Sequence, residues 1–310
     1  MIRKVACIGF GTIGSGWAAL FAWNGLEVSV FDLNKDFIQN SMKNVERALF
    51  LMNNLFENKG KVETILKRIR VAETLEMAIE DADYVQESAA ENYGTKKELF
   101  GKMDKVLRKD VIIATSTSGL KISEIQKAAE KHPERCITVH PYNPPYVIPL
   151  VEIVPGEKTS KETVNTTYEF METLGKKPIV VQKNIPGMVA NRLAAALWRE
   201  AVNLVISDIA SPEEIDKAIK YGPGIRWPIT GIFLTYHLGG GLKGMEHFLS
   251  FFKSHFENLW KDLANWTEYP PNSFEKILEK MESYAAAKRT YEELTEERDK
   301  KIANLLKIMD

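Results

Sequence analysis

The chain has 310 residues, about twice the size of a typical single domain, so two domains are expected. Hydrophobic residues make up 45% of the chain and charged residues 27%, a composition that excludes intrinsic disorder and favours folded domains with sizeable cores. The 41 basic and 42 acidic residues nearly cancel, which excludes the basic surface that holds nucleic-acid phosphates, so we expect no nucleic-acid partner.

The segment 1–26 has few charges and superficially resembles a signal peptide or a short membrane span. Glycines and polar residues interrupt its apolar run between Gly9 and Asn24, and a membrane span would avoid them. A strand, a turn and a helix explain the segment better, so we expect no membrane association. The two cysteines, Cys7 and Cys136, match neither a disulfide framework nor a metal-ligand pattern, which favours a reducing, cytoplasmic compartment.

Short apolar strands alternate with helices along the N-terminal part of the chain. The strands are expected at Lys4–Ile8, Glu27–Phe31, Tyr84–Gln86, Val111–Ala114, Cys136–His140, Leu150–Val154 and Pro178–Val181. One helix is expected to follow the turn Gly9–Gly16, a second shows apolar residues at steps of three and four from Ile38 to Phe56, and a third covers Thr95–Leu107. This alternation predicts an α/β fold with a parallel, doubly wound sheet of the Rossmann type.

The pattern changes at Asn184-Ile185-Pro186-Gly187, after which strand patterns almost disappear. Long helices are expected instead, over Gly187–Ile209 and Tyr284–Ile308. We therefore predict a Rossmann-type domain over residues 1–184 and an all-helical domain over residues 185–310.

A glycine-rich motif follows the first strand and opens the first helix. It reads Gly9-Phe10-Gly11-Thr12-Ile13-Gly14, a G-x-G-x-x-G pattern. Gly9 would permit a tight turn, Gly11 would let a pyrophosphate approach the backbone, and Gly14 would let the helix pack closely on the strand. Asp32, at the end of the second strand, would accept hydrogen bonds from an adenosine ribose and repel a 2′-phosphate. The context favours NAD binding over an ordinary turn, and Lys35 is the nearby cation that would favour NADP instead.

A second group of polar residues follows later strands. Ser118 lies just after one strand, His140 ends another, and Glu152 comes from the strand after that. In an open α/β sheet, ligands bind at the carboxyl ends of the strands. A carboxylate that reaches the imidazole would select its tautomer and favour its protonated form, as a group that exchanges a proton with a substrate hydroxyl requires. A purely structural histidine is the alternative interpretation.

These pieces together resemble the L-3-hydroxyacyl-CoA dehydrogenase superfamily over nearly the whole chain. The matching segments are GFGTIG, ESAAENYGTKKELF, TSTSGL, HPYNPPYVIPLVE and IPGMVANR. The resemblance implies that His140 is the general acid/base and Glu152 its partner. It also implies that Ser118 and Asn191 hydrogen-bond the substrate oxygen. Glu91 and Lys96 match positions that the family places near the nicotinamide.

Within the superfamily, QESAAE, YGPGIRW and GIFLTYHLGGGLKGMEHF resemble the L-carnitine 3-dehydrogenases. The lambda-crystallin and L-gulonate 3-dehydrogenase group is a close second, and a 3-hydroxyacyl-CoA substrate stays open. Carnitine would need an aromatic cage for its trimethylammonium and a cation for its carboxylate. The candidates for the cage are Tyr142, Tyr146, Trp198, Trp227 and Tyr236, and the candidates for the cation are Arg226 and Arg192. Core packing is the alternative role for each aromatic residue.

The expectation is therefore an NAD-dependent enzyme that oxidises a small 3-hydroxy acid, forms a homodimer and holds no metal. His237, His247 and His255 lack further ligands at metal-binding spacing. A non-enzymatic NAD-binding or structural protein is the rival of a different class. Against it stands the joint presence of Ser118 and His140 with Glu152 and Asn191, which a structural protein would not need.

Overall fold

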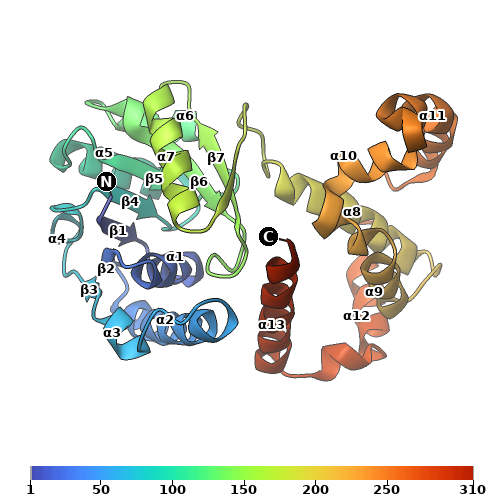
Figure 1. The fold of residues 1–310 in the computed structure, drawn as a ribbon, viewed down its shortest axis with the longest axis horizontal. Coiled ribbons are helices and arrows are strands. Elements are labelled where there is room, and N and C mark those ends of the chain that lie inside the picture. The colour runs from blue at the N-terminus through green and yellow to red at the C-terminus, as the bar shows by residue number, and fades with distance from the viewer. Residues whose placement is uncertain (1, 310) are drawn as a thin grey trace. The chain divides into compact units, whose positions relative to one another are not determined.

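The computed structural model describes residues 2–309 and divides into two compact units, the first ending at Arg192 and the second beginning at Leu193 (Figure 1). The division falls within helix α8 (Ala190–Ile206), whereas the sequence places a domain boundary after residue 184, before this helix. That boundary stays a prediction.

The first unit is built on one eight-stranded sheet with the order β3-β2-β1-β4-β5-β6-β7-β8. Its strands are β1 (Lys4–Ile8), β2 (Glu27–Phe31), β3 (Ile69–Val71), β4 (Tyr84–Glu87), β5 (Ile112–Thr115), β6 (Cys136–Pro141), β7 (Leu150–Pro155) and β8 (Lys177–Val180). The predicted doubly wound α/β fold is confirmed. One part of the prediction is wrong: β7 pairs antiparallel with β6, while all other neighbouring strands run parallel. The loop 142–149 holds no crossover helix that could return the chain to the starting edge, so β7 runs back beside β6.

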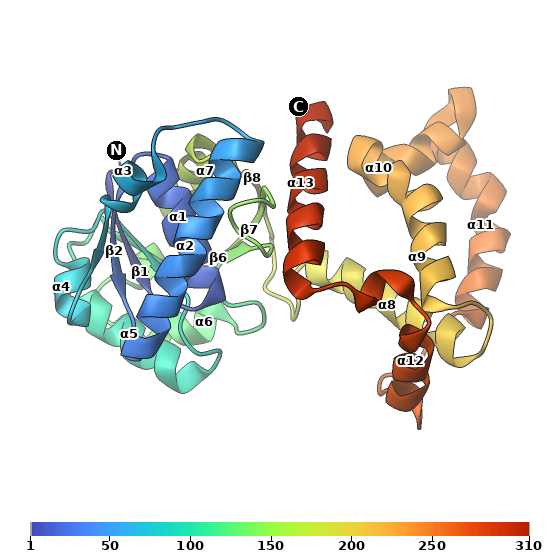
Figure 2. The ribbon, with the colours of Figure 1, turned by 90° about the horizontal axis from the view of Figure 1, so that it is seen from below.

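Helices cover both faces of this sheet (Figure 2). One face carries α1 (Thr12–Trp23), α2 (Lys35–Leu55) and α7 (Lys161–Thr173), and the other carries α4 (Leu75–Ile79), α5 (Tyr93–Val106) and α6 (Ile122–Ile125). The first core contains Trp17, Phe21 and Phe170, and the second contains Phe100 and Met103. Shorter helices complete the unit: α3 (Val62–Leu66), η1 (Gln126–Ala128) and η2 (Pro133–Arg135). These two cores pack against both faces of the sheet and fix the positions of the carboxyl ends of the central strands.

Residues 193–309 form helices and no strand, as the sequence predicts. After α8 these are α9 (Pro212–Tyr221), η3 (Pro223–Ile225), α10 (Trp227–Gly239), η4 (Gly241–Lys243), α11 (Gly244–Asp262), α12 (Ser273–Glu282), η5 (Ala285–Lys288) and α13 (Tyr291–Met309). The helix expected over Tyr284–Ile308 is interrupted. Thr290 accepts a hydrogen bond from the backbone N–H of Glu293, whose carboxylate accepts one from the backbone N–H of Thr290. This reciprocal cap starts a new helix there.

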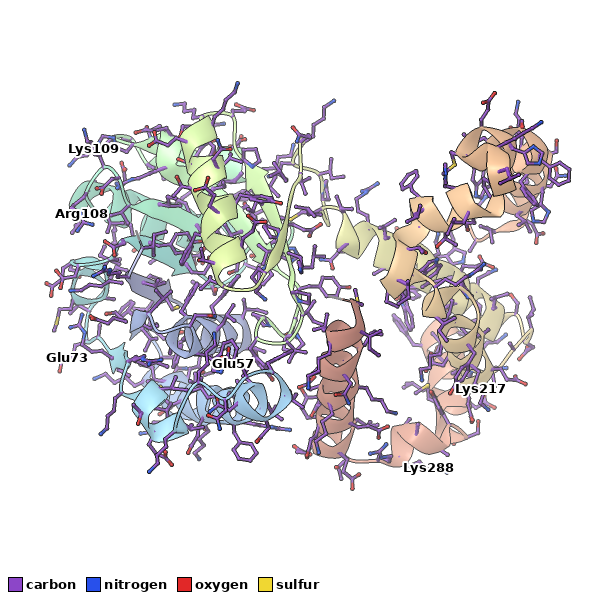
Figure 3. All side chains as sticks on the ribbon, viewed as in Figure 1. Glu57, Glu73, Arg108, Lys109, Lys217 and Lys288 are labelled. Atoms are coloured by element: carbon purple, nitrogen blue, oxygen red, sulfur yellow. The ribbon has the colours of Figure 1, made fainter. Side chains whose placement is uncertain are left out.

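Charged side chains such as Glu73, Arg108 and Lys109 point outward from the first unit (Figure 3). Arg108 also forms an ion pair with Asp83 at 3.1 Å. Within residues 2–309, no helix combines the length and the apolar character that crossing a membrane requires.

Candidate active site

His140 and Glu152 form the centre of the site, and the sheet itself brings them together. His140 lies on β6 directly opposite Glu152 on the antiparallel strand β7. His140 Nδ1 lies 2.8 Å from Glu152 Oε2, and both side chains are almost fully buried. The other carboxylate oxygen, Oε1, accepts hydrogen bonds from the backbone N–H groups of Val189 and Ala190 at 2.8 and 2.9 Å.

These contacts determine the charge of Glu152. Burial alone would raise the pKa of Glu152, but the hydrogen bonds from His140, Ala190 and Val189 outweigh burial and hold this pKa below its usual value. Glu152 is therefore ionised at neutral pH and can only accept. His140 Nδ1 must carry the proton in their hydrogen bond, which leaves Nε2 as the nitrogen that can take up a proton.

A cavity of about 520 Å³ lies at the carboxyl ends of β4, β5 and β6. It is lined by the predicted site residues Ile13, Glu91, Lys96, Ser118, His140, Tyr142 and Asn191. The lining also includes residues of the matching segments to which the sequence assigns no individual role: Ser88, Ala89, Ser116, Pro141 and Asn143. Hydroxyl, amide, imidazole and charged groups thus converge on one space, as a site for a small polar substrate requires.

The glycine-rich turn leaves room for a ligand at one of its three glycines. Gly9 has φ +88°, and a Cβ there would lie 2.5 Å from the backbone nitrogen of Ala89. A Cβ on Gly14 would lie 2.0 Å from the carbonyl oxygen of Gly9, so this glycine serves helix packing. A Cβ on Gly11 would meet nothing within 4 Å. Gly11 is also the N-cap of α1 and provides no side-chain cap, which leaves the first N–H groups of the helix available for a phosphate. The turn fits a dinucleotide.

Asp32 has a structural contact that the motif does not reveal. Its Oδ2 accepts a hydrogen bond from the backbone N–H of Phe10 at 2.7 Å, and its Oδ1 accepts one from Asn34 at 2.9 Å. Ser41 on α2 donates to the carbonyl oxygen of Phe10. Asp32 therefore holds the glycine-rich turn against the end of β2, in addition to its predicted role toward the ribose.

Lys96 and Glu91 line the cavity, and Lys96 pairs with the buried Glu87, which lies in the segment ESAAENYGTKKELF but has no predicted role. Lys96 is 1% exposed, and its Nζ lies 2.8 Å from Glu87 Oε1 and 3.5 Å from Glu91 Oε2. Glu91 Oε1 accepts hydrogen bonds from the Thr117 hydroxyl and from the backbone N–H of Ser118. Glu91 thus fixes the loop that carries Ser118, while Glu87 balances the buried charge of Lys96.

Lys176, a residue that no sequence motif indicates, holds the loop 142–149 through hydrogen bonds to its backbone. Lys176 Nζ donates hydrogen bonds to the carbonyl oxygens of Pro145 and Ile148, the latter at 2.7 Å. Burial lowers the pKa of Lys176 to about 7. Gly16 on α1 makes room for this loop, because a Cβ there would lie 2.9 Å from Pro145 Cδ. These contacts fix the loop that brings Tyr142 to the cavity.

The other predicted substrate contacts, Arg226 and Trp227, lie in the second unit, where Arg226 precedes the first residue of α10. Their role toward a substrate stays a prediction. Within residues 2–309, no group of three or more His, Cys, Asp or Glu side chains is arranged to hold a metal ion.

Comparison with known families and proteins decides what this arrangement belongs to. The model of the NAD-binding domain of 3-hydroxyacyl-CoA dehydrogenase matches residues 4–185, and the model of its C-terminal domain matches residues 187–280. The chain belongs to the 3-hydroxyacyl-CoA dehydrogenase family. It is an NAD-dependent dehydrogenase, which confirms the predicted enzyme class and cofactor.

Individual relatives support the same assignment. L-carnitine dehydrogenase from Oceanobacillus iheyensis is 38% identical over 100% of this chain and 99% of its own length. L-carnitine dehydrogenase from Pseudomonas aeruginosa is 40% identical over 84% of this chain and 79% of its own length. Among solved structures, the NAD⁺-dependent 5-formyl-3-hydroxy-2-methylpyridine 4-carboxylic acid 5-dehydrogenase matches with a TM-score of 0.83 and 31% identity, covering 100% of this chain and 99% of that one. The 3-hydroxybutyryl-CoA dehydrogenase from Escherichia coli matches with a TM-score of 0.66 and 28% identity, covering 90% of this chain and 57% of that one.

Proposed function

We propose that this dehydrogenase oxidises L-carnitine to 3-dehydrocarnitine. Three L-carnitine dehydrogenases are 38–42% identical to the chain over at least 85% of its length, whereas the 3-hydroxybutyryl-CoA dehydrogenase from Escherichia coli is 28% identical. Tyr142 lines the cavity beside His140 and offers an aromatic face to a trimethylammonium group. Trp227 and Arg226 complete the proposed set of contacts as predictions from the sequence.

The hydrogen bond between His140 and Glu152 is the observation that carries the chemistry. Because Glu152 accepts the Nδ1 proton, His140 Nε2 is the atom that takes the proton from the 3-hydroxyl group. The imidazole becomes positively charged as it does so, and the buried carboxylate of Glu152 stabilises that charge. NAD, when bound, supplies the acceptor for the hydride.

The remaining predicted site residues hold substrate and cofactor. In the proposal, Ser118 and Asn191 donate hydrogen bonds to the substrate oxygen, and Glu91 keeps the Ser118 loop in place. The turn residues Gly9, Gly11, Thr12, Ile13 and Gly14 would hold the pyrophosphate, and Asp32 the adenosine ribose. Glu91 and Lys96 would line the nicotinamide end of the same space.

We also propose that the protein is a homodimer whose interface lies on the second unit. Many large apolar side chains of this unit are exposed, among them Leu193, Leu197, Ile229, Phe233, Leu238 and Phe251. Apolar surface of this extent is typical of a face that another copy covers. Light scattering after gel filtration should give twice the mass of the chain, and a monomer at micromolar concentration would contradict the proposal.

The two cysteines fit the cytoplasmic compartment that the sequence favours, and we propose this location. Cys7 and Cys136 are free and buried. Burial raises the pKa of Cys136 to about 12, so its thiol is unreactive at neutral pH. Fractionation of the native host tests this location, and recovery outside the cytoplasm would contradict it.

A substrate panel with NAD tests the proposed activity. L-carnitine, L-gulonate and 3-hydroxybutyryl-CoA would each be assayed by the appearance of NADH, with His140→Ala as the matched inactive control. The proposal expects L-carnitine to have the highest kcat/KM. Higher efficiency with L-gulonate or the CoA thioester would reassign the substrate within the same chemistry.

A further inference from the structure

Beneath the cavity, four polar side chains form a continuous chain of hydrogen bonds that the proposed mechanism does not use. Tyr84 and Gln86 lie on β4, Ser88 follows β4, and Ser116 follows β5. Tyr84 Oη lies 2.8 Å from Gln86 Oε1, Gln86 Nε2 lies 2.8 Å from Ser116 Oγ, and Ser116 Oγ lies 2.8 Å from Ser88 Oγ. Tyr84 and Gln86 are fully buried, whereas Ser88 and Ser116 line the cavity.

The carbonyl group of Val139 sets the direction of the first hydrogen bonds, because a carbonyl oxygen can only accept. It lies 3.2 Å from one end of the Gln86 amide, so that end must be the NH₂ group. The same nitrogen donates its second proton to Ser116 Oγ. Gln86 Oε1 therefore faces Tyr84, whose hydroxyl donates to it.

Ser116 then has a single possible arrangement. Its Oγ also accepts a hydrogen bond from the indole N–H of Trp17 at 3.2 Å, and an indole nitrogen can only donate. Both lone pairs of Ser116 Oγ are thus occupied, by Gln86 and Trp17. The hydroxyl proton of Ser116 goes to its remaining partner, Ser88 Oγ. Ser88 accepts this bond, and within residues 2–309 its own proton has no acceptor.

Ser88 lies against the glycine-rich turn. A Cβ on Gly9 would lie 2.6 Å from the backbone carbonyl carbon of Ser88, and a Cβ on Gly14 would lie 3.6 Å from Ser88 Cβ. β4, which leads to Ser88, neighbours β1 on the side opposite to β2, which leads to Asp32. A dinucleotide crosses this point with its adenosine toward β2, so its other half reaches the end of β4.

We propose that the Ser88 hydroxyl donates a hydrogen bond to an oxygen atom in the nicotinamide half of the bound dinucleotide. The buried chain of Tyr84, Gln86 and Ser116 orients this donor before the cofactor arrives, so binding does not have to order it. The proposal rests on NAD as the cofactor and is independent of which hydroxy acid the enzyme oxidises.

Titration of the intact protein with NADH, followed by fluorescence and without any hydroxy acid, tests this role. Ser88→Ala should raise the Kd for NADH about threefold to tenfold, the usual effect of losing one hydrogen bond. Ser88→Thr keeps the hydroxyl and should restore most of the affinity. Ser250→Ala is the control, since Ser250 lies on α11, outside the cavity lining, and its hydroxyl donates to the carbonyl oxygen of His247; the Kd for NADH of this variant should stay at the wild-type value.

Ser116→Ala tests the direction of the hydrogen bonds that run from Tyr84 to Ser88. It leaves the buried donors of Trp17 and Gln86 without their acceptor, so it should lower Tm more than Ser88→Ala does. It should weaken NADH binding less than Ser88→Ala, because the Ser88 hydroxyl remains. An unchanged Kd for NADH in Ser88→Ala would overturn the proposal, as would a loss confined to the KM of the hydroxy acid. A Tm of Ser116→Ala equal to that of the wild type would overturn the assigned direction.

Discussion

His140 and Glu152 stand opposite each other on the antiparallel strands β6 and β7 and share a hydrogen bond of 2.8 Å. The second oxygen of Glu152 accepts two backbone N–H groups, from Val189 and the first residue of α8, Ala190. The same carboxylate therefore orients the imidazole and connects β7 to the start of the helix that carries Asn191. A substitution of Glu152 should therefore disturb both the orientation of the His140 imidazole and the position of the first turn of α8.

Replacing His140 by alanine should lower kcat about 10²- to 10⁴-fold, the usual contribution of a positioned acid/base. The glycine-rich turn does not depend on this side chain, so NADH affinity should stay close to the wild-type value. Steady-state kinetics and NADH titration measure the two effects separately. Near-normal turnover of the variant would show that another group accepts the proton.

Replacing Glu152 by glutamine should reduce kcat less than the loss of His140 and should move the pH dependence. Glutamine lacks the negative charge that stabilises the protonated imidazole, and oxidation requires His140 in its neutral form. The acidic limb of the pH–rate profile for oxidation should therefore shift to lower pH. The measurement is kcat/KM from pH 5 to pH 9. A shift to higher pH would contradict the proposed ion pair.

Asp32 should make the enzyme prefer NAD over NADP, because a carboxylate repels a 2′-phosphate. Asp32→Asn is the informative variant: its amide oxygen can still accept from the backbone N–H of Phe10, as Asp32 does at 2.7 Å, while the charge and the hydrogen bond from Asn34 are lost. The ratio of kcat/KM for NAD over NADP should fall by roughly tenfold, the effect of about 1.4 kcal/mol. Equal use of both cofactors by the wild type would show that Asp32 does not discriminate.

Lys176 should make stability depend on pH above neutrality. Burial lowers its pKa from 10.5 to about 7, so between these pH values the unfolded chain binds more protons than the folded one. The free energy of unfolding should therefore rise with pH across this window. Lys176→Met removes this contribution. The Tm of the wild type should therefore rise relative to the Tm of the variant between pH 7 and pH 9.5. The exposed neighbour Lys177 offers the control Lys177→Met, whose Tm difference should stay constant; a constant difference for Lys176→Met would contradict the assignment.

The sequence predicts most of the sheet because its central strands are buried on both faces and read as short apolar runs. The bounds of β4 to β8 differ from the prediction by at most one residue at either end. The sequence does not predict β3 (Ile69–Val71), since its Arg70 and Val71 are exposed and form no apolar run. The apolar pattern of β7 does not show that this strand runs antiparallel to β6. The only sequence signal is the loop 142–149, which is too short for the crossover that a parallel strand needs.

The candidate site could be predicted where residue types follow a motif, as at Gly11 and His140. Glu87 and Gln86 lie in matching segments, but neither they nor Lys176 could be assigned a role, because each acts through a partner on another element. The sequence of one strand does not show which side chains of the neighbouring elements will contact it. The available signal is weak: Gln86 and Glu87 are polar residues within an otherwise apolar strand, and such residues must find buried partners.

The central claim is that L-carnitine is the substrate, and the ratio of kcat/KM for L-carnitine over 3-hydroxybutyrate tests it most directly. The two molecules share the 3-hydroxy acid, and 3-hydroxybutyrate lacks the trimethylammonium group. If Tyr142 and its neighbours hold that cation with a contact of about 2 kcal/mol, the ratio should be roughly thirtyfold, and Tyr142→Ala should reduce it. A ratio near one, or no NADH formation with L-carnitine, would contradict the account.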